Sequence, residues 1–418
     1  MLLQLWIVER ALFYFSLPFY FQLCCTCELN PSKSMKKNSL FILIAVIAIA
    51  LVAWVGCTTE QEVKEPTEMD EMALINEVSA KWAGSAHADA ASEAFNHWNE
   101  DDPAEVPVAC AKCHSSSGFQ DFVGNDGSAA GVVDAAGKII DPITCATCHN
   151  DAADNLTSVT LPNGKEFTDL GNSAICMTCH SGMGSADAVD AAITSAGVGE
   201  DDVIEGQALL GVHYLAAASV QLGADGGMGY QYEGKSYVGT FKHADPVNSC
   251  TECHDPHSLH TKEVEGSDAN LCSTCHSDVQ SYQDYKKISM SKVDYDGDGT
   301  TESTYDEIEG MRQVLIKALQ GYANAKSGVG FIFEPKVYPY AFIDTNGDGE
   351  ISEGEAIYPN QFKAFTPRML KAAYNLMFVT KEPAAYVHNP EYVLQLMYDS
   401  IEDLSEFSGV STEGLVRP

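Results

Sequence analysis

The chain has 418 residues, of which 59 are acidic and 24 are basic, and its formal net charge at pH 7 is −35. Because such a charge repels phosphates and anionic lipid headgroups, the composition excludes a nucleic-acid-binding protein. Basic redox proteins, divalent cations and positively charged mineral surfaces are compatible partners. An acidic surface that only keeps the protein soluble is an equal alternative.

The first 72 residues predict an export and anchoring region. An apolar run at residues 40–56 follows two lysines, and a positive segment before an apolar one is the order of a secretory signal. The run ends at Trp54-Val55-Gly56-Cys57, which resembles a bacterial lipobox apart from Trp54 and predicts lipidation of Cys57. A plain transmembrane anchor is the alternative, since the run is just long enough to span a bilayer.

We divide this region into a mis-assigned upstream start (residues 1–34), a lipoprotein signal peptide (residues 35–56) and an acidic tether (residues 57–72). With Cys57 lipidated, the mature chain has no free cysteine outside the motifs described next, which suits an oxidising compartment. The expected location is the outer membrane or the cell surface, with the periplasm as the alternative.

Five copies of the pentapeptide Cys-x-x-Cys-His lie within residues 73–278. The copies are Cys110–Cys113–His114, Cys145–Cys148–His149, Cys176–Cys179–His180, Cys250–Cys253–His254 and Cys272–Cys275–His276. This spacing is the attachment signature of haem c: two thiols bond the porphyrin and the adjacent imidazole ligates the iron. Zinc ribbons and small disulfide loops also use paired cysteines, but neither explains a histidine after every pair.

The motifs therefore predict five covalently bound haems c in a domain at residues 73–278. Because macrocycles fill space that side chains fill elsewhere, we expect a mostly α and irregular fold with little regular sheet. The fourth and fifth motifs are close in sequence, and we expect their haems to pack against each other.

The distal side of each iron needs a second ligand, and the chain's 12 histidines leave seven outside the motifs. The candidates for distal ligands are His87, His213, His243, His257 and His388. His257 follows His254 by three residues, so its ring would point to a neighbouring haem. His97 and His260 are expected on the surface. Methionine is an alternative ligand, as Met177 and Met183 lie in or near a motif.

Residues 279–418 contain no haem motif and predict a mainly helical region. Residues 306–325 have helical periodicity. Thr366-Pro367 and Asn389-Pro390 each place an N-cap residue before proline, which predicts helices at residues 368–380 and 391–404.

Two acidic loops in this region resemble EF-hand calcium loops. The better match offers ligands at Asp344, Asn346, Asp348, Glu350, Ser352 and Glu355. The other begins with Asp294, Asp296 and Asp298 and would be closed by Asp306, Glu307 or Glu309. Since neither follows a convincing helix, we expect structural Ca²⁺ with a dissociation constant of about 10⁻⁴–10⁻³ M rather than a switch. An acidic surface turn is the alternative.

In its motifs, lipoprotein-like start and surplus histidines, the chain resembles multihaem c-type cytochromes of extracellular electron transfer, including filament-forming ones. The resemblance implies an electron carrier and not an enzyme. Five haems with two histidine ligands each would pass electrons by hopping towards other redox proteins or extracellular acceptors such as metal oxides and partner cells. A calcium-bridged filament or other homo-oligomer is compatible with this function.

The alternative to an electron carrier is an enzyme, a haem reductase. Ammonia-forming nitrite reductases resemble this chain in having five haems and calcium, but they commonly carry a Cys-x-x-Cys-Lys motif that is absent here. Such an enzyme needs one haem with an open face, so the distal ligands separate the two functions.

Overall fold

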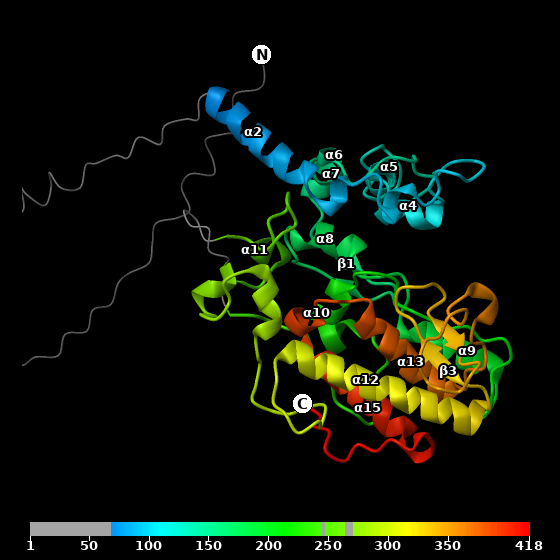
Figure 1. Cartoon of the computed structure of the whole chain (residues 1–418). Coiled ribbons are helices and arrows are strands. Elements are labelled where there is room, and N and C mark those ends of the chain that lie inside the picture. The colour runs from blue at the N-terminus through cyan, green and yellow to red at the C-terminus, as the bar shows by residue number, and fades with distance from the viewer. Residues whose placement is uncertain (1–67, 245–246, 264–270) are drawn as a thin grey trace, which may run out of the picture. The chain divides into compact units, whose positions relative to one another are not determined.

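The computed structural model of the chain describes residues 68–244, 247–263 and 271–418 (Figure 1). The predicted lipidation site Cys57, the segments predicted at residues 1–34 and 35–56, and most of the predicted tether lie outside the described residues. The last tether residues form the start of helix α2 (Glu68–Ala83). Among the described residues, no helix combines the length and apolar character needed to cross a membrane.

Short helices joined by irregular segments make up the first part of the described chain. These elements are α2 (Glu68–Ala83), η1 (Ala86–Ala88), α3 (Glu93–Asn96), α4 (Val108–His114), α5 (Ser116–Phe122), α6 (Cys145–Cys148), α7 (Asp151–Asp154), β1 (Val159–Thr160), β2 (Glu166–Phe167), α8 (Ser173–Cys179), α9 (Ala186–Ala196), α10 (Ala217–Gly226), α11 (Cys250–Cys253), η2 (Leu271–Thr274) and η3 (Tyr282–Lys287).

Longer helices follow in the second part. The elements are α12 (Thr304–Tyr322), η4 (Ala323–Ser327), β3 (Phe331–Phe333), β4 (Ala341–Ile343), η5 (Tyr358–Asn360), α13 (Pro367–Thr380), α14 (Ala385–His388) and α15 (Pro390–Ser408). The described sheets are two antiparallel pairs, β1–β2 with Val159 opposite Phe167 and β3–β4 with Phe331 opposite Ile343. The predicted fold class, mostly α and irregular with little sheet, is confirmed.

The three predicted C-terminal helices are confirmed as α12, α13 and α15. The hydroxyl of Thr366 accepts a hydrogen bond from the Met369 amide at 3.2 Å, and the Asn389 side chain caps α15 through the Tyr392 amide at 3.2 Å. Each cap satisfies an amide that the first helical turn leaves without a partner, and proline follows it at the first helical position.

Helices α12 and α15 lie side by side (Figure 1). A methyl group added at Gly321 of α12 would lie 1.9 Å from the Ser408 carbonyl oxygen, so the two helices meet where no side chain fits. The same apolar core contains buried Met177, which lies within the third motif, and buried Leu396 of α15. The domain boundary at residues 278–279 stays a prediction, and the core packs across it.

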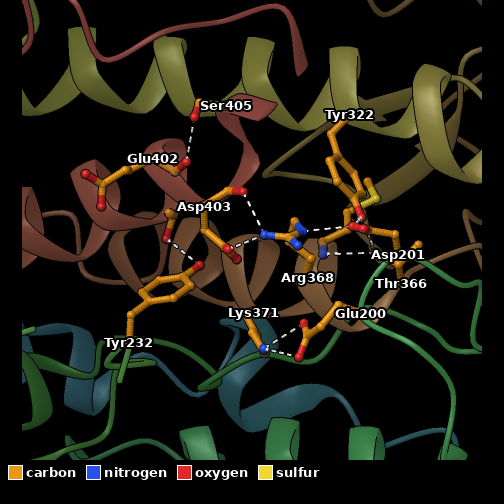
Figure 2. Close-up of polar contacts among 12 residues, drawn as sticks. Glu200, Asp201, Tyr232, Tyr322, Thr366, Arg368, Lys371, Glu402, Asp403 and Ser405 are labelled. Carbon is orange, nitrogen blue, oxygen red and sulfur yellow. Dashed lines mark hydrogen bonds and ion pairs between the residues drawn. The ribbon is translucent and has the colours of Figure 1, made fainter. Parts of the chain in front are cut away.

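A network of ion pairs and hydrogen bonds centred on Arg368 links the elements that form this core (Figure 2). The Arg368 guanidinium donates to the Asp201 carboxylate at 2.8 Å and to the Asp403 carbonyl oxygen at 3.0 Å, and it also pairs with the Asp403 carboxylate. The Tyr322 hydroxyl donates to Asp201 at 2.7 Å. Arg368 thus joins α13 to α15, and through Asp201 it joins the segment after α9 to α12.

Replacing Arg368 by methionine should lower the free energy of unfolding by about 2 kcal/mol, because it removes the cation that the partly buried carboxylates of Asp201 and Asp403 share. Chemical denaturation followed by circular dichroism measures the change. The exposed Lys363, replaced in the same way, is the control and should change stability little. Equal effects of the two substitutions would contradict the structural role of Arg368.

Candidate haem-binding sites

Each Cys-x-x-Cys-His motif forms a short helical turn, in α4, α6, α8, α11 and η2. In such a turn residues three apart share a face, so both thiols of a pair project to one side. Two turns are stabilised locally by capping boxes, formed by Thr144 with Thr147 and by Ser249 with Glu252. All ten motif cysteines are described and none forms a disulfide.

Every motif histidine lies beside one histidine from outside the motifs. The ring centroids are 5.9 Å apart for His114 and His213, 6.1 Å for His149 and His257, 6.3 Å for His180 and His87, 6.5 Å for His254 and His388, and 6.2 Å for His276 and His243. The five partners are the five histidines predicted as distal candidates, and each pair lies within one chain.

These separations fit a metal ion held between two imidazoles. A metal–nitrogen bond of about 2.0–2.1 Å on each side, with the nitrogens at the facing ring edges, puts the two ring centroids about 6 Å apart. A zinc site would instead bring cysteines and histidines together on one ion. Among the described residues, no group of three or more cysteines and histidines converges in that way. The donors therefore fit haem iron.

The partners come from segments far from the motifs they face. His87 lies in η1 and faces His180, and His388 ends α14 and faces His254. His257 lies three residues after one motif histidine but faces another, His149, as the prediction of a neighbouring haem required. His243 lies in the segment before α11.

The remaining histidines and the two methionines lie elsewhere. His97 is exposed and its Nδ1 is 2.7 Å from the Glu93 carboxylate, and His260 is exposed. Met177 is buried in the apolar core, while half of the Met183 surface is exposed. Since each motif histidine has a histidine partner, the methionines are not needed as ligands.

Hydrogen bonds at Nδ1 fix the tautomer of several of these rings. The Nδ1 atoms of His114, His180 and His254 donate to the carbonyl oxygens of Ala94, Leu215 and Leu259 at 2.8, 3.1 and 3.1 Å. A carbonyl only accepts, so the proton sits on Nδ1, which leaves the Nε2 lone pair free for a metal.

In three of these rings a lowered pKa favours the neutral form that binds metals. Burial, followed by the charge of His180, lowers the pKa of His87 to about 4. Burial likewise lowers the pKa values of His213 and His254. Neutral imidazoles are therefore present at these positions at pH 7.

Comparison with known proteins agrees with this chemistry. A family model described as a doubled CXXCH motif matches residues 243–281, which contain the fourth and fifth motifs. The chain is 25% identical over 393 residues to the C-type polyheme cytochrome OmcB of Geobacter sulfurreducens, an alignment that covers 79% of this chain and 48% of OmcB. It is 27% identical over 387 residues to the C-type polyheme cytochrome OmcC of the same species, covering 77% and 45%.

The chain is thus similar to multihaem c-type cytochromes. It spans about half the length of these curated relatives. No solved structure matches it.

Three of the motifs lie in contact with one another. The Cys250 amide of the fourth motif donates to the hydroxyl of Ser173, the first residue of the third motif's helix α8, at 3.2 Å. The Cys179 thiol also lies 3.8 Å from the Lys112 carbonyl oxygen. The third motif therefore lies between the first and the fourth, an order that the sequence does not indicate.

Backbone hydrogen bonds of Lys262 link the fourth and fifth motifs. The Lys262 amide donates to the Cys253 carbonyl oxygen, and the Leu271 amide donates to the Lys262 carbonyl oxygen, each at 2.8 Å. The predicted packing of haems four and five stays a prediction that this backbone contact supports.

The first of the two predicted calcium loops brings three carboxylates together. Oxygens of Asp294, Asp296 and Glu307 lie within 4.8 Å of one another. Burial, followed by the charges of Asp298 and the other two acids, raises the pKa of Asp296 to about 6. Of the three acids predicted to close this loop, Glu307 is buried against it and accepts from the Tyr295 amide at 2.7 Å.

The second loop follows β4 and forms a closed turn. Asp344 accepts hydrogen bonds from the amides of Gly347 and Gly349 at 2.6 and 2.9 Å. Glu355 is buried and accepts from the amides of Thr345 and Ser352 at 2.8 and 2.9 Å. Within the described residues its acids do not converge as those of the first loop do. The loop at residues 344–355, which matches the EF-hand sequence pattern better, therefore has the more widely spaced carboxylates.

Proposed function

We propose that the chain carries five covalently attached haems c and passes electrons between redox partners. Each iron would be held by a motif histidine and the histidine beside it. The observation that carries this proposal is the repetition of one geometry: five histidine pairs with centroid separations of 5.9–6.5 Å.

The residues of each site have separate roles in this proposal. The two thiols would fix the macrocycle, and the two imidazoles would hold the iron between them and so keep substrates away from it. When bound, haem supplies one-electron exchange between Fe(III) and Fe(II). The Nδ1 hydrogen bonds hold the imidazole planes in place, which limits reorganisation when the charge changes.

The histidine pairs favour a carrier over a reductase. A nitrite reductase-like enzyme needs one iron with an open face, whereas every motif histidine here has a partner on the far side. The pairs form within one chain, so coordination would not require a second copy even if the protein assembles into filaments.

The proposed setting is outside the cytoplasm, with Cys57 as a lipid anchor in the outer membrane or at the cell surface. The predicted signal at residues 35–56 supports export, and the charge of −35 suits basic redox proteins or mineral surfaces such as metal oxides. The similarity to two polyheme cytochromes supports electron transfer as the activity.

Replacing His257 by alanine should convert one haem to the high-spin state, because the iron at the His149 site would lose its sixth ligand. Covalent attachment should persist, since the thiols of the second motif are unchanged. Electron paramagnetic resonance and haem quantification per chain measure the two outcomes.

His260 offers a matched control for this substitution. It lies three residues from His257, is exposed, and faces no motif histidine among the described residues. His260→Ala should keep every haem low-spin. An entirely low-spin spectrum of His257→Ala would remove His257 from the ligands and contradict the pairing at the second motif.

We further propose that the acidic loops bind structural Ca²⁺. Asp294, Asp296, Asp298 and Glu307 would hold one ion, a set favoured by the three carboxylates within 4.8 Å. The loop at residues 344–355 would hold a second ion through the ligands predicted there. Both sites would be closed by a buried glutamate, Glu307 or Glu355.

Calcium at one hundred times its dissociation constant should stabilise the protein by about 2.7 kcal/mol per site. Glu307→Gln and Glu355→Gln should each reduce the number of ions bound from two to one, as measured by titration calorimetry. Glu309→Gln is the control, since Glu309 lies on the same helix as Glu307 but pairs with Arg312. Unchanged binding in both glutamate variants would contradict the proposal.

A further inference from the structure

Two consecutive residues just after α13, Lys381 and Glu382, carry opposite charges in the interior. Lys381 is 5% exposed and Glu382 is 3% exposed, and charged side chains are rarely buried so completely. They lie near different histidine pairs. Glu382 contacts the pair His254–His388 directly, whereas Lys381 is separated from the pair His114–His213 by the ring of Tyr214.

Glu382 contacts a histidine pair directly. Its Oε1 accepts a hydrogen bond from His388 Nδ1 at 3.0 Å, and His388 faces His254. The Nδ1 atoms of His114, His180 and His254 donate to uncharged carbonyl oxygens instead. A carboxylate makes the imidazole a stronger electron donor, which stabilises Fe(III) and lowers the reduction potential.

Lys381 places a positive charge near the other histidine pair. Its ammonium is 4.0 Å from the ring centroid of Tyr214 and 3.7 Å from that of Tyr340. The Tyr214 ring is 5.1 Å from that of His213, which faces His114. The segment is held there because the Leu215 amide donates to the Lys381 carbonyl oxygen at 2.8 Å.

The charge of Lys381 is not neutralised nearby. Its ammonium donates to the Pro335 carbonyl oxygen at 3.4 Å, and no carboxylate of the described residues forms an ion pair with it. A buried positive charge beside a haem ligand disfavours Fe(III) and raises the reduction potential.

We propose that Lys381 and Glu382 set a difference in reduction potential between two haem sites, raising that of the His114–His213 site and lowering that of the His254–His388 site. The proposal rests on the proposed haem ligation. Since the third motif contacts the first through Cys179 and Lys112 and the fourth through Ser173 and Cys250, the two sites lie on one series of neighbouring motifs. At equilibrium an electron on this series would favour the His114–His213 site.

The test is a redox titration of the haem-loaded protein, followed by electron paramagnetic resonance. His388→Ala and His213→Ala first identify the two low-spin signals, each by its loss. Glu382→Gln should then raise the midpoint of the His388 signal, changing the reduced-to-oxidised ratio at the original midpoint by about tenfold. Lys381→Met should lower the midpoint of the His213 signal, while Lys381→Arg, which keeps the charge, should leave it in place.

Two further variants are matched controls. Glu93→Gln removes a carboxylate from the exposed His97, which faces no motif histidine, and Lys336→Met removes an exposed charge next to Pro335. Both should leave the midpoints unchanged, because solvent and salt screen exposed charges.

The outcomes separate this proposal from the proposed ligation. If His388→Ala or His213→Ala removes no low-spin signal, the pairing is wrong and the proposal falls with it. If both signals are identified but their midpoints do not move in Glu382→Gln and Lys381→Met, the charges do not set the potentials. A high-spin haem in Glu382→Gln would show that Glu382 positions His388 as a ligand. That result would overturn the electrostatic role of Glu382.

Discussion

The proposed function depends on the pairing of each motif histidine with a second histidine about 6 Å away, a spacing that fits two ligands of one metal ion. The covalent motif supplies only one member of each pair. The other member must be brought from elsewhere and held at a defined distance, so the rest of the chain serves to place five imidazoles. His87 of η1 and His388 of α14 show how far apart in sequence the two members are.

This constraint gives the helical C-terminal region a role in a multihaem protein. Its apolar core, fastened by Arg368, positions the end of α13 and the short helix α14. From there His388 reaches the fourth motif, and the Lys381 carbonyl holds the segment of His213 against the first. The region without a motif thus contributes to two of the five sites, and it also carries the charges that we propose to tune them.

The features that could be predicted from the sequence are those that depend on residues close together in the chain. The attachment motifs and the caps at Thr366 and Asn389 are local patterns, and so the haem chemistry and the helices α13 and α15 followed from them. The distal candidates came from elimination among a few histidines. Their partners could not be predicted, because the pairing of His87 with His180 depends on packing between distant segments. The contact between Lys112 and Cys179, which places the third motif beside the first, is equally non-local.

The most direct test of this account is the electron paramagnetic resonance spectrum of the oxidised protein, with haem quantified per chain. Five low-spin haems are predicted. The nearly parallel rings of His149 with His257 (11°) and His180 with His87 (24°) should give rhombic signals. The rings of His114 and His213, inclined at 78°, leave two iron orbitals close in energy and should give a signal with a large maximum g value. Fewer than five haems, or a high-spin signal from an iron with an open face, would contradict the account.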